Sequence, residues 1–511
     1  MTRLGAGVSG LTAWRRLAFA FAMGAVSATG FAPLEFFPAL LLGYAALVLL
    51  IDGAMAGQRP VRRASAAGWA FCFGQYFVGW HWIGFAFLVD AADHLWQMPF
   101  ALVSLPAGAA LYGALAGGVA AFFWRPGSSS RLLVFAMCFA GVEWLRGHLF
   151  TGFPWNLSAY GWAASLELLQ STSLMGAYGL SFVTILLGAS LAEFAYGRWR
   201  VPATMGVLFA ALWSYGVYRI TNTPMRDVPG VHLRLVQPAI PQAEKYVRRL
   251  LLRNWQRLVG LSARPGNPSV IVWPEAATGY PVARAPGMLQ AIGLFTARGQ
   301  TLITGSDRIV EGDGHLIGYN SLYLFSPAGV PPVQVYDKFH LVPFGEYVPF
   351  ARILNRIGIT QLTVGEGFSS GDHPHVMQVS GAPPMTPLIC YEVIFPHAVT
   401  DPDAPRPRWF VNITDDSWFG PWAGPRQHFL TARVRAIEEG VPIARDANTG
   451  ITAVIDGNGR VRAGLGLNRL GIVDSALPAA LPLTLYARFG DLIFLILLVT
   501  AAFLAFLRAR A

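Results

Sequence analysis

Long apolar runs and short alternating segments divide the sequence into two kinds of chain. Apolar runs of about 17–25 residues, the length at which an α-helix crosses the hydrocarbon core of a bilayer, precede Asn222 and follow Tyr486. They predict eight transmembrane helices, at residues 16–32, 38–54, 66–88, 97–123, 131–150, 170–196, 202–220 and 489–507. Seven of these spans come before a long mixed interval, and the eighth follows it.

The mixed interval has the pattern of a water-soluble domain. Short β-rich segments lie at 232–237, 269–275, 300–305, 320–325, 386–390 and 409–414, and helical patterns lie at 244–261 and 427–439. Strands that alternate with helices predict an α/β or mixed layered sandwich. The expected organisation is therefore seven transmembrane helices in residues 1–220, a globular domain in 221–488 and a C-terminal transmembrane helix in 489–511.

Composition supports the membrane assignment. Of the 511 residues, 54% are hydrophobic and 13% are charged, whereas a soluble domain carries about 25% charged residues. Much of the chain must therefore face lipid. No cleavable signal peptide is expected, because the first apolar run leads into Gly-Phe-Ala-Pro at 30–33 and then into further spans, as in a retained signal anchor.

Basic residues in the short loops predict the orientation. They gather before the first span, after the second, fourth and sixth spans, and at the end of the chain: Arg3, Arg15, Arg16, Arg59, Arg62, Arg63, Arg125, Arg131, Arg198, Arg200, Arg508 and Arg510. With eight spans, all these loops fall on one side, which the positive-inside rule makes the cytoplasm. Both termini are then cytoplasmic and the globular domain lies on the far side. The net charge of +10 partly reflects this topology, so no nucleic-acid partner is expected.

Cys390 is the first candidate for chemistry. Of the three cysteines, Cys72 and Cys138 lie in predicted spans, whereas Cys390 ends a short apolar strand in Pro-Leu-Ile-Cys-Tyr-Glu at 387–392. One cysteine in an exported domain predicts no disulfide framework. On its own, Cys390 fits a buried small hydrophobic residue and a nucleophile about equally well.

Two further charged residues follow apolar strands. Glu275 comes directly after a strand and a proline, and Lys338 stands in Tyr-Asp-Lys-Phe-His at 336–340. With Cys390 they form a set suited to acyl transfer: a thiolate attacks a carbonyl, a carboxylate takes the thiol proton and an ammonium stabilises the oxyanion. Each residue alone also fits a structural role, as a surface carboxylate, a solvated lysine or a core cysteine.

In this order, Glu275, Lys338 and Cys390 resemble the Glu-Lys-Cys triad of the nitrilase superfamily. With the eight spans, nearly the whole chain resembles the apolipoprotein N-acyltransferase family of the bacterial inner membrane. Further matching segments lie at 142–147, 151–155, 341–349, 416–420 and 486–490. The resemblance implies a membrane helical bundle joined to a nitrilase-like αββα sandwich, the latter in the periplasm.

The resemblance also implies roles for individual residues. Glu275 would be the general base, Lys338 the oxyanion stabiliser and Cys390 the nucleophile, with the backbone N–H of Tyr391 as a second oxyanion donor. The supporting or substrate-binding residues it implies are Glu346, Tyr391, Glu392, Trp418 and Tyr246. Tyr246 follows Ile-Pro-Gln at 240–242 where the family usually carries tryptophan, so this position has lost an indole N–H.

The implied reaction is a ping-pong transfer in a lipid environment. A phospholipid would donate the acyl chain to Cys390, and the α-amino group of the S-diacylglyceryl cysteine of an apolipoprotein would accept it. Membrane lipids are the expected surroundings, and the protein is expected to be a monomer. No cofactor and no metal are expected, because the sequence carries no metal-ligand spacing or nucleotide fingerprint.

Alternatives remain open at this point. The same triad would serve a membrane-anchored amidase that hydrolyses a small substrate, and a transporter or lipoprotein-binding scaffold is a third possibility. The apolar segment at 339–362 is either an arm packed on the globular domain or a loop that enters the outer leaflet. Glu143 and Arg146, three residues apart in one predicted span, fit a functional site and an internal ion pair equally.

Overall fold

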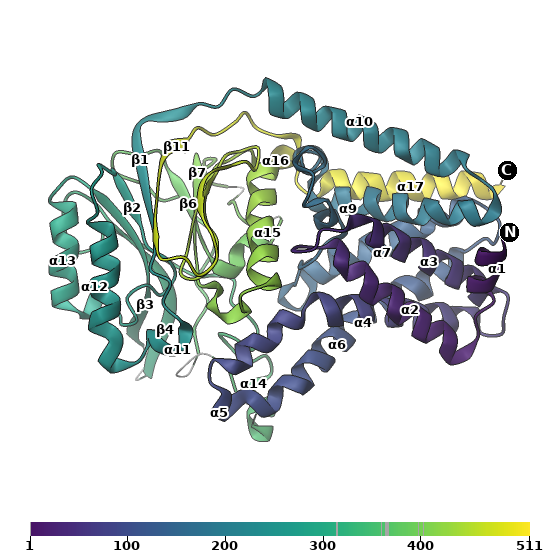
Figure 1. Cartoon of the computed structure of the whole chain (residues 1–511), viewed down its shortest axis with the longest axis horizontal. Coiled ribbons are helices and arrows are strands. Elements are labelled where there is room, and N and C mark those ends of the chain that lie inside the picture. The colour runs from purple at the N-terminus through teal and green to yellow at the C-terminus, as the bar shows by residue number, and fades with distance from the viewer. Residues whose placement is uncertain are drawn as a thin grey trace. The chain divides into compact units, whose positions relative to one another are not determined.

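The chain forms two compact units in a computed structural model, which describes residues 2–510 except 313–314, 359, 363–366, 397 and 402. The first unit comprises Met1–Trp82, Pro99–Thr223 and Leu483–Ala511, and the second comprises Ile83–Met98 and Pro224–Pro482. Figure 1 shows helices in the first unit and sheets flanked by helices in the second.

The first unit is built from apolar helices. They are α1 (Arg3–Ser9), α2 (Ala13–Ser27), α3 (Phe37–Met55), α4 (Pro60–Gly79), α6 (Met98–Phe123), α7 (Ser130–His148), α8 (Leu166–Leu169), α9 (Thr172–Ser190), α10 (Arg200–Asn222), α16 (Leu485–Phe489) and α17 (Leu492–Arg510). Among the described residues, five helical stretches are long and apolar enough to cross a membrane: Phe37–Met55, Ala91–Phe123, Ser130–Thr151, Thr172–Tyr196 and Arg200–Asn222. Leu492–Leu507 is a shorter apolar helix. Several helices suited to crossing a membrane are thus present among the described residues, but the predicted count of eight is not confirmed.

The third predicted span, at 66–88, differs from the helix that forms there. α4 begins at Pro60, in the first turn, where the missing N–H of proline costs no hydrogen bond. The α-helix ends at Gly79, and His81–Leu88 continues as a 3₁₀-helix. Apolar residues continue through both elements, so hydropathy alone could not locate this change.

Glycines let α2 and α4 approach each other closely. A side chain at Gly24 of α2 would collide with the carbonyl of Phe71, and one at Gly74 of α4 would collide with the carbonyl of Phe21. Small residues at a helix interface allow such backbone contact in membrane proteins. This contact explains why both helices belong to one packed unit although neither meets the span criteria.

Glu143 and Arg146 on α7 hold a nearby turn rather than each other. The Glu143 carboxylate accepts hydrogen bonds from the N–H and the hydroxyl of Ser158, the latter at 2.6 Å. Arg146 donates to the carbonyl oxygens of Phe153 and, at 2.9 Å, Trp155. Both side chains are buried, so their cost in an apolar unit is offset by these contacts.

The second unit contains two sheets. One has the strand order β11-β1-β2-β3-β4-β5 and the other β10-β9-β8-β7-β6. The strands are β1 (Asp227–Gln237), β2 (Val270–Val272), β3 (Thr301–Gly312), β4 (His315–Phe325), β5 (Gln334–Asp337), β6 (Met385–Ile389), β7 (Trp409–Thr414), β8 (Ile443–Ala447), β9 (Thr452–Ile455), β10 (Val461–Leu465) and β11 (Gly471–Pro478). The helices are α5 (Ala91–His94), α11 (Gln242–Lys245), α12 (Leu251–Ser262), α13 (Pro286–Thr296), α14 (Ala351–Leu354) and α15 (Ala423–Glu439).

The sheets pack face to face between two layers of helices. Residues from both sheets share one core, including Leu235, Ile303, Ile389 and Val411. A second core joins the outer face of the first sheet to α12 and α13, and α15 covers the other sheet (Figure 1). The unit is therefore an αββα sandwich, as the resemblance implied.

Candidate active site

The carboxyl ends of several strands bring the candidate residues together. β2 and β3 are parallel, and β5 runs in the same direction because β4 is antiparallel to both β3 and β5. Glu275 follows β2 and Lys338 follows β5, so both emerge at one edge of the first sheet. In the second sheet β6 and β7 are parallel, and Cys390 and Asp415 follow them.

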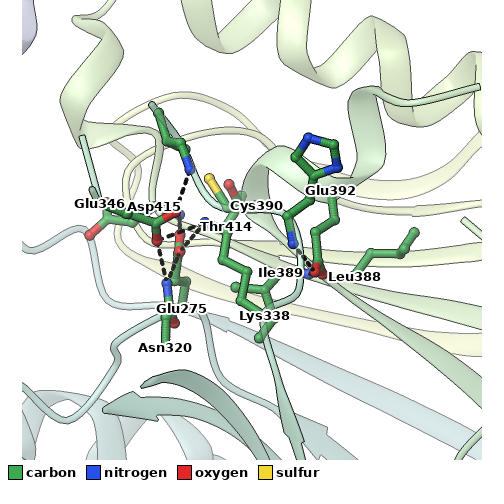
Figure 2. Close-up of polar contacts among 12 residues, drawn as sticks. Glu275, Asn320, Lys338, Glu346, Leu388, Ile389, Cys390, Glu392, Thr414 and Asp415 are labelled. Carbon is green, nitrogen blue, oxygen red and sulfur yellow. Dashed lines mark hydrogen bonds and ion pairs between the residues drawn. The ribbon is translucent and has the colours of Figure 1, made fainter. Parts of the chain in front are cut away.

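Lys338, Glu275 and Glu346 form one buried polar cluster with Asn320 (Figure 2). The Lys338 ammonium donates to Glu346 Oε1 at 2.9 Å and to Glu275 Oε1 at 3.4 Å. Asn320 Nδ2 donates to the same two oxygens, at 3.0 and 2.7 Å. Each carboxylate is also held by a backbone N–H: Glu275 Oε2 by Asp415 at 2.8 Å, and Glu346 Oε2 by Val342 at 2.8 Å. The two carboxylates are thus fixed in position around one ammonium.

Cys390 lies on a tight turn that Glu392 braces. Its φ of 51° is in the left-handed region, which costs a residue with a side chain on the order of 1–3 kcal/mol. Glu392 Oε2 accepts from the N–H of Ile389 at 2.6 Å, and Oε1 accepts from the N–H of Phe339 at 2.8 Å and the hydroxyl of Tyr336 at 3.0 Å. Glu392 therefore joins the turn that carries the cysteine to the segment that carries Lys338.

Figure 2 shows the cysteine sulfur on the side of Lys338 and the two clustered carboxylates, with the Glu392 carboxylate on the other side of the turn. Burial raises the pKa of the Cys390 thiol well above its ordinary value, the Glu275 carboxylate raises it further and the Lys338 ammonium opposes both. Burial lowers the pKa of Lys338, but Glu346 and then Glu275 outweigh it, so the pKa is raised. The resting site therefore holds a neutral thiol beside a permanently charged ammonium.

His428 provides a second contact that holds the cysteine turn. A ring nitrogen of His428, Nε2, lies 3.1 Å from the carbonyl oxygen of Cys390, and Nδ1 lies 2.7 Å from Asp416 Oδ1. Arg445 donates to Asp416 Oδ2 at 2.8 Å, and all three side chains are fully buried. α15 therefore holds the backbone of the cysteine turn through His428, in addition to the contacts that Glu392 makes.

Lys245 adds a second ammonium to the site. It forms an ion pair with Asp415 and donates to the carbonyl oxygen of Glu275 at 3.0 Å. Asp415 Oδ1 accepts from Asn448 Nδ2 at 3.1 Å. Because the Asp415 N–H also holds the Glu275 carboxylate, Lys245 and Asp415 fix both the backbone and the side chain of Glu275.

The remaining predicted residues lie around this cluster. The ring of Tyr391 is buried and meets His340 and Phe395 edge-on, with centroids 5.8 and 5.2 Å apart. Trp418 is half-buried on the turn that follows β7. Tyr246 ends α11 with 43% of its surface exposed. These three rings are thus placed at the rim or the flank, while Glu346 and Glu392 make direct contacts with the site.

Sequence reasoning missed Asn320, Asp415, Lys245 and His428. The pattern at 320–325 predicts a strand, but by itself it gives Asn320 no chemical role. Its signal was that Asn320, Leu322 and Leu324 share one face of β4, so Asn320 continues the face that packs into the core. The other three became visible only when the fold brought distant segments together.

Comparison with known proteins decides the family. Residues 23–190 match the model described as apolipoprotein N-acyltransferase N-terminal domain, and residues 233–481 match the model described as carbon-nitrogen hydrolase. An apolipoprotein N-acyltransferase from Rhodopseudomonas palustris is 41% identical, over 100% of this chain and 98% of the relative. The chain belongs to the apolipoprotein N-acyltransferase family.

Other members of the family are similarly identical to this chain over nearly their full length. The apolipoprotein N-acyltransferase from Bradyrhizobium diazoefficiens is 40% identical over 98% of this chain and 96% of its own, and that from Caulobacter vibrioides is 39% identical over 95% and 93%. The resemblance stated from the sequence is therefore confirmed. In this member of the apolipoprotein N-acyltransferase family, all residues of the site lie within 233–481, the part that matches the carbon-nitrogen hydrolase model.

Proposed function

We propose that the protein is an apolipoprotein N-acyltransferase that works through a Cys390 thioester. It transfers a fatty acyl chain from a phospholipid to the α-amino group of the N-terminal S-diacylglyceryl cysteine of apolipoproteins, which completes lipoprotein maturation. The observation that carries the proposal is the buried thiol of Cys390 beside Glu275 and Lys338, in a chain 41% identical to a curated member over its full length.

In the first half-reaction, Glu275 takes the thiol proton and Cys390 attacks the phospholipid ester carbonyl. The Lys338 ammonium and the N–H of Tyr391 stabilise the oxyanion. When the intermediate collapses, the ester C–O bond breaks, and the lysophospholipid oxygen leaves with the proton that Glu275 took. The raised pKa of the thiol means that it stays protonated until a substrate arrives, which suits transfer of its proton to a base within the site.

In the second half-reaction, the acceptor amine attacks the thioester carbonyl. Glu275 takes a proton from the attacking nitrogen and returns it to the departing sulfur, which regenerates the thiol. Water must be kept from the thioester meanwhile. The cluster around Lys338 is buried, which supports transfer over the hydrolysis expected of a simple amidase.

Supporting roles follow from the contacts. Glu346 positions Lys338, which it contacts at 2.9 Å, and Glu392 braces the cysteine turn. We assign Tyr246 and Trp418 to substrate binding at the rim, because both rings are accessible. Tyr391 contributes its backbone N–H rather than its buried ring.

For the membrane part, we propose eight spans, with both termini in the cytoplasm. Seven precede the catalytic domain in residues 1–220, residues 221–488 form that domain in the periplasm, and residues 489–511 hold the last span of this inner-membrane protein. The arginine-rich loops support this orientation, and a monomer remains the expected state. We also propose that segment 339–362 enters the outer leaflet, since Phe350 and Ile353 are 77% and 65% exposed.

One experiment tests the central step. Purified protein is incubated with labelled phospholipid, and the labelled adduct is treated with hydroxylamine. An adduct that hydroxylamine removes, and that Cys390→Ala lacks, supports the thioester, and an adduct that persists in Cys390→Ala refutes it. Discharge of the adduct by a diacylated lipopeptide, compared with discharge by water, then separates a transferase from a hydrolase.

A further inference from the structure

One hydrogen-bond acceptor in the site has no partner. Asn320 donates through Nδ2 to Glu275 and Glu346, which fixes its amide orientation because carboxylates only accept. Its Oδ1 atom is buried and has no hydrogen-bond partner among the described residues. A buried carbonyl oxygen left without a donor costs free energy, so this oxygen marks a place where a bound molecule would supply an N–H or O–H.

A second acceptor lies beside it. Asp307 on β3 is the direct cross-strand partner of Asn320 on β4, so the two side chains share a face with Cβ atoms about 5 Å apart. Gly305, two residues earlier on that face, is packed against Glu275: a Cβ there would lie 2.6 Å from Glu275 Cα. Asp307 is therefore a neighbour of the proposed general base as well as of Asn320.

The Asp307 carboxylate is available to bind a ligand. It is half-buried and forms no hydrogen bond or ion pair with a side chain in the described part of the chain. Burial raises its pKa to about 6, Lys245 opposes the shift, and Glu275 and Glu346 add to it. It is thus still a carboxylate at neutral pH.

The surrounding charges favour a cation. The cluster holds four carboxylates, those of Glu275, Glu346, Asp415 and Asp307, against the two ammonium groups of Lys245 and Lys338. Lys245 is already paired with Asp415, and Lys338 with Glu346 and Glu275. Two negative charges are in excess, one on the group of Glu275, Glu346 and Lys338 and one on Asp307. Together they repel the phosphate of a phospholipid and attract a protonated amine.

We propose that Asp307 and the Oδ1 atom of Asn320 bind the α-ammonium group of the acceptor and hold its nitrogen next to Glu275. The inference rests on the proposed function and assigns the acceptor's amino group a site within it. Asn320 then has two tasks, since its Nδ2 holds the catalytic carboxylates and its Oδ1 receives the substrate.

The proton balance follows from this placement. The bound ammonium gives one proton to the Asp307 carboxylate, which passes it to solvent because its side chain is partly exposed. The neutral amine attacks the thioester carbonyl, and Glu275 takes the second proton. The C–S bond breaks, and the sulfur receives that proton from Glu275, so each turnover releases an amide, a free thiol and one proton to water.

Asp307→Asn tests the inference, with Glu311→Gln as the matched control. Glu311 is an exposed carboxylate on the same strand, so its loss changes the charge without touching the site. The thioester is first accumulated with labelled phospholipid, and its discharge by a diacylated lipopeptide is then timed. We expect Asp307→Asn to lower kcat/KM for the lipopeptide about 10–100-fold more than it lowers acylation, the scale of losing a hydrogen bond to a charged group. Asp307→Glu should restore part of the loss, and Glu311→Gln should match the parent.

Two further measurements test whether Asp307 binds the ammonium group of the acceptor. Hydroxylamine is a largely uncharged nucleophile at neutral pH, so its discharge of the thioester should differ little between Asp307→Asn and the parent. Equal losses with hydroxylamine and the lipopeptide would indicate general damage and overturn the inference. If the site instead binds a phospholipid headgroup, Asp307→Asn will slow acylation from phosphatidylethanolamine but not from phosphatidylglycerol, which also overturns it. Failure of the thioester to form in the parent would refute the proposed function itself.

Discussion

The Lys338 ammonium lies between two carboxylates at different distances. Glu346 is the closer, at 2.9 Å, and its second oxygen is occupied by the N–H of Val342. Glu275 is farther, at 3.4 Å, and lies on the side of the cysteine. The second oxygen of Glu275 is likewise held, by the N–H of Asp415, so the two carboxylates differ in their distance from the ammonium. If Glu275 takes a proton, Glu346 still pairs with Lys338. One carboxylate alone could not perform both tasks.

Glu392 gives a prediction with opposite pH trends for stability and activity. Burial raises the pKa of its carboxyl from the ordinary value of 4.5 to about 7. The folded protein therefore keeps a proton that the unfolded chain releases, and the free energy of unfolding should fall as pH rises between about 4.5 and 7. Activity should instead rise towards pH 7, because the ionised carboxylate accepts the N–H groups of Ile389 and Phe339.

Glu392→Gln checks both trends. The amide places an N–H against backbone N–H groups, which should cost on the order of 1–3 kcal/mol in the free energy of unfolding. It should also remove the part that Glu392 contributes to the dependence of acylation rate and of stability on pH near 7, while Glu439, whose pKa burial also raises to about 7, keeps its own part of the stability change. Denaturant unfolding and thioester formation, each measured across that range, provide the data. An unchanged pH profile in the variant would assign the titration to another group.

At the residue scale, the sequence supplied the groups with strong chemical character. Glu275, Lys338 and Glu346 were predicted as site residues, and the structure brings all three into contact. Asn320 and Asp307 were not predicted, because each is a polar residue in a strand. Only the cross-strand register shows that they lie next to each other and to the site. A single sequence carries no record of that register.

At the element scale, strand direction decides the site more than any helix does. Glu275, Lys338 and Cys390 all follow the carboxyl ends of strands, and the sequence showed this order. Helix ends were harder to predict: the pattern at 244–261 predicted one helix, but the chain forms α11 and α12 with a 3₁₀ turn between them. Periodicity continues through such a turn, so it does not show where the α-helix is interrupted.

The segment Ile83–Met98, which packs with the catalytic unit, gives the next prediction. Gly420 follows the turn that carries Trp418, with φ of 67°, and a Cβ there would lie 2.5 Å from the ring of Phe85. Gly420→Ala should cost on the order of 1–3 kcal/mol for the backbone alone, plus the displacement of the ring. We expect slower acyl transfer, because Trp418 moves with the turn.

A double-mutant cycle separates the two costs. Phe85→Ala should recover the part of the Gly420→Ala loss that comes from the clash, with a coupling of about 0.5–3 kcal/mol, and leave the backbone part. Gly466→Ala is the control, since that glycine has open space around it. Strict additivity of Phe85→Ala and Gly420→Ala would show that this contact does not position Trp418.

At the scale of the whole molecule, hydropathy separated the membrane part from the catalytic part because the two have different solvents. The number of spans is harder to predict from hydropathy. α2 has 15 residues and includes Arg15 and Arg16, and α4 includes Arg62 and Arg63. α2 is thus too short for a span, and α4 is long enough but not apolar enough on average, although apolar residues dominate the centres of both.

The sidedness of the catalytic domain can be argued without the full count. Between Pro126 and Arg298 the chain contains three of the helices that are long and apolar enough to cross a membrane: Ser130–Thr151, Thr172–Tyr196 and Arg200–Asn222. An odd number of crossings puts these two exposed positions on opposite faces. In a Cys390→Ser background, a membrane-impermeant maleimide should therefore label Arg298→Cys but not Pro126→Cys in cells with a permeabilised outer membrane. Lysis should expose both positions and serves as the control. Labelling of Pro126→Cys before lysis would reverse the orientation, and labelling of both would remove one of the three crossings.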